Sequence, residues 1–341
     1  MMVEAINRER AMGKFKAYRI YNEEGKVQAR LVEAMLDELD PGEVVIKTAF
    51  SSVNYKDALA ATGAGKIVRR FPCIGGVDAC GTVASSTDAR FKQGDQVICT
   101  SFDLGVAHDG GYSEYMRVPA AWVVPLPKGL TLFDAMALGT AGFTAGLAVE
   151  RMEHDGLKPA NGPVVVTGAT GGVGSIAIDI LAGAGYQVTA LTGKEGEVDY
   201  LKRLGAKDII LRGSLQLSKI KPLDKATWAG AVDNLGGDVL AWLASTMQIG
   251  GTLASIGLAA SHALNTTVMP FILRGVSLLG IDSVNAPMNV RQRVWQRLAS
   301  DLKPRHLSDM CTSVKLEQLP AVFDKILNAQ VRGRTVVKLT D

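Results

Sequence analysis

Pro163-Val-Val-Val-Thr-Gly-Ala-Thr-Gly-Gly-Val-Gly-Ser-Ile-Ala-Ile178 is the stretch that decides the fold of this chain. Residues 164–167 predict a buried strand, the glycines predict a tight turn, and the residues from Ser175 onward have the apolar spacing of a helix. A strand, a glycine-rich turn and a helix start together form an anion site, because bare N–H groups and the helix dipole favour negative charge there. The spacing Gly168, Gly171, Gly174 is a variant of the dinucleotide fingerprint. The alternative is a tight turn that binds no ligand.

The cofactor is expected to lay its pyrophosphate along Thr170, Gly171, Gly172 and Val173. An NAD site usually carries an acidic residue at the end of the next strand, about twenty residues further on, where it holds the ribose hydroxyls. That strand, 187–191, ends here in Thr192, Gly193 and Lys194. A hydroxyl and an ammonium suit a 2′-phosphate, and Arg212, after the third strand, is expected to reach the same group. The sequence therefore favours NADPH, whereas the alternative is that these charges are solvated.

Size and composition limit the classes of protein to which the chain can belong. Its 341 residues are enough for two domains, and a net charge of +3 with no basic block argues against nucleic-acid binding. No apolar run of about twenty residues is present, so we expect no membrane span. Residues 1–14 are charged and lack the apolar segment of a signal peptide. The four cysteines are scattered, as in a cytoplasmic protein with reduced thiols.

The pattern of strands and helices predicts an α/β protein of two domains. Short strand-like runs separated by glycine, proline and aspartate fill the first part of the chain. From Val164 strands and helices alternate, which predicts a doubly wound parallel sheet of six strands. The tail after Asp282 is expected to return to the first domain. We therefore predict a β-rich catalytic domain over 14–137, completed by 284–341, and a nucleotide-binding domain over 138–283.

From about Lys14 onward the chain resembles the medium-chain dehydrogenase/reductase superfamily, and more narrowly its zinc-free, quinone oxidoreductase-like, acrylyl-CoA reductase branch. The resemblance implies a GroES-like β-rich domain followed by a Rossmann domain. It rests on the glycine motif above and on six further runs: 52–59 (SVNYKDAL), 65–72 (GKIVRRFP), 110–115 (GGYSEY), 267–274 (TVMPFILR), 280–283 (GIDS) and 328–335 (NAQVRGRT).

The resemblance also allows a test for zinc. Alcohol dehydrogenases of the superfamily hold catalytic zinc through a Cys, a His in a Gly-His-Glu run and a later Cys. Here the first position reads Asn54-Tyr55, and the chain contains no Gly-His-Glu run. No pair of cysteines has ligand spacing. The four histidines are isolated in the sequence, at His108, His154, His262 and His306. We therefore predict no metal.

The resemblance implies NADPH-dependent reduction of acrylyl-CoA to propanoyl-CoA. A hydride adds to the β-carbon, and hydrogen-bond donors stabilise the charge that moves to the thioester oxygen. Tyr55 is the first candidate at the chemical centre, as a hydrogen-bond or proton donor facing the nicotinamide. Asp57 is expected to orient groups or supply protons, and Asn54 to hold the cofactor amide or the substrate carbonyl. The alternative is that Asn54 and Asp57 cap a turn and the helix that begins near Lys56.

By resemblance, the nicotinamide end meets Leu258, Ile272 and Ser283, and Asn328 closes the site. Leu258 and Ile272 are equally explained as ordinary core residues. A basic cluster, which we call the 66–70 cluster, is expected near the cleft and consists of Lys66, Arg69 and Arg70. Coenzyme A carries several negative charges that these residues would meet, although a solvated face explains them as well.

Two other functions remain open at this point. A quinone or enone reductase would use the same hydride chemistry, and a non-catalytic NADPH-binding protein would use only the nucleotide site. The sixth strand, 276–281, has an apolar sequence at the edge of the predicted sheet. Because such edges are often paired between subunits, we also expect a homodimer.

Overall fold

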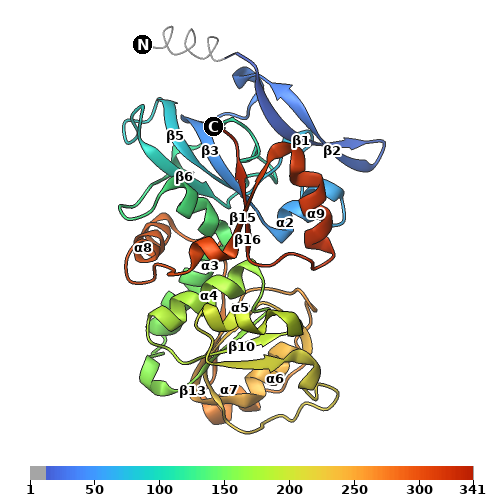
Figure 1. The fold of residues 1–341 in the computed structure, drawn as a ribbon, viewed down its shortest axis with the longest axis vertical. Helices are drawn as coiled ribbons and strands as arrows, with labels where there is room; N and C mark the ends of the chain where they lie inside the picture. Colours follow the sequence, from blue (N-terminus) through green and yellow to red (C-terminus); the bar gives the residue numbers. More distant parts are fainter. Residues whose placement is uncertain (1–12, 341) are drawn as a thin grey trace. The chain divides into compact units, whose positions relative to one another are not determined.

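The computed structural model describes residues 13–340, which form two compact units (Figure 1). The first unit comprises residues 13–140, 284–292 and 311–340, and the second comprises 141–283 and 293–310. The sequence predicts that residues 293–310 belong to the first domain. In the structure Trp295 stacks on Phe143 at 6.2 Å between ring centroids, and Arg297 forms an ion pair with Glu153. These apolar and ionic contacts hold the segment 293–310 within the second unit.

The second unit contains a parallel sheet of six strands, as predicted. Its strands follow the spatial order β11-β10-β9-β12-β13-β14. Their bounds are β9 (Val164–Thr167), β10 (Val188–Thr192), β11 (Asp208–Leu211), β12 (Trp228–Asp233), β13 (Met247–Ser255) and β14 (Ser277–Gly280). The helices that connect them are α4 (Gly172–Gly183), α5 (Val198–Arg203), α6 (Gly237–Thr246) and α7 (Met269–Arg274). Because the strand order reverses between β9 and β12, right-handed connections place helices on both faces, so the doubly wound fold is confirmed.

The first unit is built on a seven-stranded sheet with the order β15-β16-β3-β5-β6-β8, in which β7 also pairs with β3. The strands are β3 (Val44–Val53), β5 (Asp78–Ser86), β6 (Gln96–Thr100), β7 (Tyr115–Val118), β8 (Val124–Pro125), β15 (Cys311–Lys315) and β16 (Arg334–Lys338). A second sheet has the order β2-β1-β4, formed by β1 (Phe15–Glu23), β2 (Lys26–Ala34) and β4 (Cys73–Ile74). Since β16 pairs with β3, the tail returns to the first part of the chain, as predicted.

Two helices of the first unit pack against each other, α2 (Tyr55–Thr62) and α9 (Leu319–Leu327) (Figure 1). On α2, Ala58 and Ala61 are buried, and on α9, Phe323 is buried, so an apolar face of each helix joins one core. The helix α2 begins after Asn54 and ends at Gly63, whose φ of 73° is the left-handed value that suits glycine.

The long helix α3 (Leu132–His154) has a break in its backbone at Gly139, where φ is 51°. Within residues 13–340, α3 alone has the length and composition of a membrane span, but 78% of its most apolar window is buried in the protein. This burial accounts for its apolar composition. The remaining helix, α8 (Met288–Leu298), carries Val294 and Trp295 into the core of the second unit.

Candidate active site

The nucleotide loop of the second unit lies at the point where the strand order reverses. β9 and β12 are neighbours, but β10 and β11 extend the sheet on one side and β13 and β14 extend it on the other. In open parallel sheets ligands bind outside the carboxyl ends of the strands at such a point. The loop from Gly168 to Gly171 follows β9 directly and leads into α4, so the predicted cofactor loop occupies this position.

The backbone conformation of this loop requires glycine at two positions. Gly168 has a φ of 57°, which is the left-handed region. A Cβ atom on Gly174 would lie 2.4 Å from the carbonyl oxygen of Gly168 and 2.9 Å from the Cα atom of Ala169. The first turn of α4 therefore lies against the loop, and its N–H groups have no acceptor within the helix. This arrangement fits the pyrophosphate of a dinucleotide, which N–H groups at a helix start bind.

A buried polar network, which the sequence analysis did not identify, braces the loop. The Thr167 hydroxyl donates to Asp233 Oδ1 at 2.7 Å, and the Asn234 side-chain amide donates to the Thr167 carbonyl oxygen at 2.7 Å. Burial raises the pKa of Asp233. The sequence does contain one indication of this contact. Thr167 and Asp233 are the last residues of two strands of one parallel sheet, and such strand ends lie at the same edge.

The residues proposed for the 2′-phosphate follow neighbouring strands. Thr192, the last residue of β10, pairs with Leu211, the last residue of β11. The position of a Cβ atom on Gly193 lies 3.6 Å from Arg212 Nη2, so the guanidinium lies beside this glycine. The Thr192 hydroxyl accepts a hydrogen bond from the Lys194 backbone N–H at 3.0 Å. The structure therefore brings residues 192–194 and Arg212 together at one edge of the sheet.

The residues expected at the nicotinamide end differ in their surroundings. Leu258 is 66% exposed and Ile272 is 70% exposed, so the alternative that they belong to the core is wrong. Ser283 is half-buried. Asn328 is exposed, and its side-chain amide donates to the Asp324 carbonyl oxygen at 2.8 Å, where it ends α9. The roles of all four toward a cofactor stay predictions.

In the first unit, the corner between β3 and α2 presents Tyr55. Asn54 is the N-terminal cap of α2, and Tyr55 is the first helical residue. Tyr55 is 56% exposed, whereas Ser52, Asp57 and Asp78 beside it are buried. The phenol is therefore more accessible than the polar groups beside it.

Asp57 performs the capping role that the sequence left as an alternative. It is 2% exposed, and its Oδ2 accepts the Asn54 backbone N–H at 2.8 Å while its Oδ1 accepts the Val77 N–H at 3.0 Å. Burial, and after it the negative charge of Asp78, raises the pKa of Asp57 to about 7. Because the side chain is buried and points inward, Asp57 acts on the corner and is not exposed to a substrate. Its predicted part in catalysis stays a prediction.

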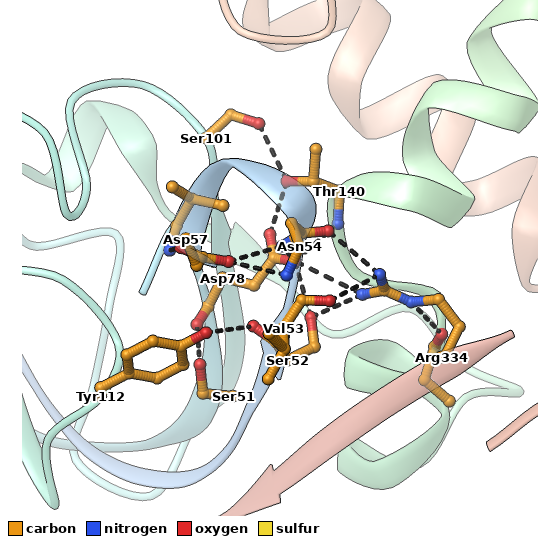
Figure 2. A network of polar contacts seen from close by, with 12 residues as sticks. Ser51, Ser52, Val53, Asn54, Asp57, Asp78, Ser101, Tyr112, Thr140 and Arg334 are labelled. Carbon is orange, nitrogen blue, oxygen red and sulfur yellow. Dashed lines mark hydrogen bonds and ion pairs between the residues drawn. The ribbon is translucent and has the colours of Figure 1, made fainter. Parts of the chain in front are cut away.

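Asp78, which the sequence analysis missed as a site residue, lies at the centre of this network (Figure 2). It is fully buried and accepts hydrogen bonds from Ser52 Oγ at 2.6 Å and Asn54 Nδ2 at 2.8 Å. Thr140 donates both its backbone N–H, at 2.9 Å, and its hydroxyl, at 2.5 Å. The guanidinium of Arg334 lies 3.7 Å away. These donors come from segments far apart in the sequence, and no local pattern links them.

The side chain of Asn54 has three partners within the corner. Its Nδ2 donates to Asp78 at 2.8 Å and to Asp57 at 3.3 Å, and its Oδ1 accepts from Arg334 Nη1 at 3.0 Å. Its predicted contact with the cofactor amide or the substrate carbonyl stays a prediction. The side chain ties the start of α2 to two carboxylates.

The 66–70 cluster is partly neutralised. Arg69 forms an ion pair with Asp103, and Arg70 forms one with Asp40. Lys66 is exposed. The two arginines therefore carry less net charge toward a phosphate than their sequence indicated.

We expect Gly174→Ala to weaken NADPH binding by about tenfold or more, because the added methyl group would displace the Gly168 carbonyl and with it the loop. Isothermal titration calorimetry measures the effect. Gly196→Ala is the matched control, since a Cβ there meets nothing within 4 Å. An unchanged Kd in a folded Gly174→Ala protein would show that the loop does not bind the cofactor.

The raised pKa of Asp57 predicts how stability depends on pH. The pKa of an aspartate in the unfolded chain is about 3.9, whereas the pKa of Asp57 in the folded state is about 7. The folded state holds the proton more tightly, so this contribution is present below about pH 4 and is lost as the pH rises through about 7. The full loss is about 4 kcal/mol, since each unit is about 1.4 kcal/mol, and about 3 kcal/mol of it falls between pH 5 and pH 8. Urea unfolding at pH 5 and pH 8 measures it, and Asp57→Asn is expected to flatten the profile. Parallel profiles for the two proteins would contradict this.

Two family models match the chain. "Alcohol dehydrogenase GroES-like domain" matches residues 40–128, and "Zinc-binding dehydrogenase" matches residues 172–300. The second name refers to zinc, but His, Cys, Asp and Glu side chains within 13–340 nowhere gather in threes as metal ligands would. Burial also raises the pKa of the Cys73 and Cys99 thiols to about 12, which disfavours the thiolates that bind zinc. The described residues therefore do not fit a zinc site.

Individual proteins match over nearly the whole chain. YhfP of Bacillus subtilis, provisionally named a quinone oxidoreductase, is 50% identical over 95% of this chain and 99% of its own. A solved structure of YhfP with NAD bound has a TM-score of 0.94 and 49% identity, and covers 96% of this chain and 100% of that one. The acrylyl-CoA reductase AcuI of Ruegeria pomeroyi is 48% identical over 92% of this chain and 96% of its own.

The YhdH oxidoreductase of Salmonella enterica, solved in complex with NADP, has a TM-score of 0.93 and 46% identity. It covers 95% of this chain and 100% of the solved one. The two family models together with these near-complete matches explain both units and their order along the sequence. The chain is thus an oxidoreductase that belongs to the medium-chain dehydrogenase/reductase superfamily, in its quinone oxidoreductase-like and acrylyl-CoA reductase-like branch.

Proposed function

We propose that this protein reduces the C=C bond of a short enoyl-CoA with NADPH, and that acrylyl-CoA is converted to propanoyl-CoA. The similarity to the Ruegeria pomeroyi acrylyl-CoA reductase, which extends over 96% of that protein, is the observation that carries the proposal. The exposed phenol of Tyr55, at the corner where alcohol dehydrogenases of the superfamily carry a metal ligand, supports it. A conjugated thioester needs less activation than a simple carbonyl, so hydrogen-bond donors are sufficient.

The geometry of the nucleotide loop supports a dinucleotide, and the basic edge supports the phosphorylated form. YhfP was crystallised with NAD and the Salmonella protein with NADP, so similarity alone does not decide between them. Arg212 lies beside Gly193, and Lys194 follows at once. A guanidinium and an ammonium at this edge would bind a 2′-phosphate, which an acidic residue would repel.

When bound, NADPH supplies the hydride that adds to the β-carbon, and a proton at the α-carbon completes the reduction. We assign to Tyr55 the donation of a hydrogen bond, through its phenol O–H, to the oxygen on which charge develops. Asn54 and Asp57 hold the backbone from which Tyr55 projects. Leu258 and Ile272 would supply an apolar surface for the nicotinamide, and exposed apolar side chains at a strand end and on α7 are suited to this.

The acceptor carries charged phosphates if it is a CoA thioester. Of the 66–70 cluster, Lys66 is the residue we propose for a phosphate contact, because the arginines already pair with Asp103 and Asp40. The homodimer through the edge strand β14 and a cytoplasmic location also stay predictions.

We expect Arg212→Glu or Lys194→Glu to raise the KM for NADPH by about tenfold or more and to leave the KM for NADH nearly unchanged, because only NADPH carries the 2′-phosphate. Steady-state kinetics with the two cofactors measure this. Arg203→Glu, at the exposed end of α5, is the control of equal charge change. Equal effects on both cofactors, or none, would reject the phosphate assignment.

The acceptor is tested by following NADPH oxidation with acrylyl-CoA, with a quinone and with no acceptor. We expect rapid turnover with acrylyl-CoA, because its thioester oxygen accepts the developing charge. Rapid turnover with the quinone alone would favour the quinone reductase. NADPH binding without turnover with either acceptor would favour a non-catalytic role.

A further inference from the structure

We propose that Arg334 is a positioning residue for Tyr55: its guanidinium clamps the end of β3 and so sets the direction in which the phenol projects from α2. The inference rests on the proposed function, because it concerns the residue to which that function gives a chemical role. Arg334 itself touches neither substrate nor cofactor in this proposal.

The contacts of Arg334 concentrate on the residues just before Tyr55 (Figure 2). The side chain is buried, and its Nη1 donates to the Val53 carbonyl oxygen at 3.1 Å and to Asn54 Oδ1 at 3.0 Å. Its Nη2 donates to Ser52 Oγ at 2.7 Å. Three consecutive residues, Ser52, Val53 and Asn54, are thus held by one guanidinium.

A fourth contact anchors the guanidinium outside β3. Arg334 Nε donates to the Ala137 carbonyl oxygen at 3.1 Å. Two residues later, Gly139 passes so close that a Cβ atom there would lie 2.6 Å from Arg334 Nη2 and 2.5 Å from Asp78 Oδ2. The break of α3 at Gly139 therefore leaves the space that the clamp occupies.

The charge of Arg334 is balanced by Asp78, which is also buried. The two groups lie 3.7 Å apart, and Ser52 bridges them by accepting from Arg334 and donating to Asp78 at 2.6 Å. A buried ion pair is stable only when its remaining donors and acceptors are satisfied. A lysine carries the same charge but lacks the planar fork, so it cannot reproduce these parallel contacts.

The direction of the Tyr55 side chain depends on this clamp because packing restrains the side chain only in part. Tyr55 is 56% exposed. Its backbone follows Asn54, whose side chain is bound to Arg334 on one side and to Asp57 and Asp78 on the other. A shift of about 1 Å in a catalytic group is enough to lower a rate substantially.

A double-mutant cycle between Arg334→Lys and Tyr55→Phe tests the inference on the full chain with NADPH and whichever acceptor it turns over. We expect Arg334→Lys to lower kcat by about tenfold and to change the KM for NADPH by less than about twofold. In the Tyr55→Phe background, Arg334→Lys is expected to lower kcat by less than about twofold, because the group that it positions is already lost. Arg90→Lys, on an exposed arginine of the same unit, is the control and should leave kcat unchanged.

Additive losses of kcat in the two backgrounds would overturn the inference and leave the role of Tyr55 intact. An unchanged kcat in Tyr55→Phe alone would overturn both, and would show that the proposed function fails at Tyr55 itself. Because a buried arginine can be needed for folding, Ser52→Ala provides a second cycle, which removes one contact of the clamp together with the hydrogen bond from Ser52 to Asp78. Coupling to Tyr55 in that cycle supports the inference, and additivity overturns it.

Discussion

The buried carboxylate of Asp78 is the constraint on which the first unit depends. A charge removed from water costs several kcal/mol unless donors and a counter-charge replace the water. Ser52, Asn54 and Thr140 supply the donors, and Arg334 supplies the charge. They come from three stretches of the chain, at the junction of β3 and α2, in α3 and in β16, so satisfying the carboxylate of Asp78 on β5 brings these stretches together.

Asp57 shows how the same environment treats a second carboxyl group. Its oxygens accept two backbone N–H groups and the Asn54 amide, but within residues 13–340 it forms no ion pair of the kind that Asp78 forms with Arg334. Burial and the charge of Asp78 therefore raise its pKa to about 7. The two neighbouring carboxyl groups therefore differ in role because their surroundings differ. Asp78 accepts the hydrogen bonds of the network, and Asp57 caps the helix that carries Tyr55.

The nucleotide loop of the second unit is shaped by contacts within its own backbone. The loop depends on backbone that approaches within contact distance of itself, as the 2.4 Å from the Gly174 Cβ position to the Gly168 oxygen indicates. Thr167, Asp233 and Asn234 then join the ends of β9 and β12 across the point where the strand order reverses. Here the site is formed mainly by residues close to strand ends, so parallel pairing by itself aligns them.

The strand, turn and helix of the nucleotide loop, the six-stranded parallel sheet and the basic edge at Lys194 and Arg212 could all be predicted from the sequence. These features are encoded by periodicity and by short spacings, which a single segment contains. The bond between Asn54 and Arg334, 280 residues away, and the pairing of Arg69 and Arg70 with aspartates could not be predicted and are seen in the folded structure. Contacts between distant segments depend on how sheets and helices close on each other, and they leave no periodic signal in either segment.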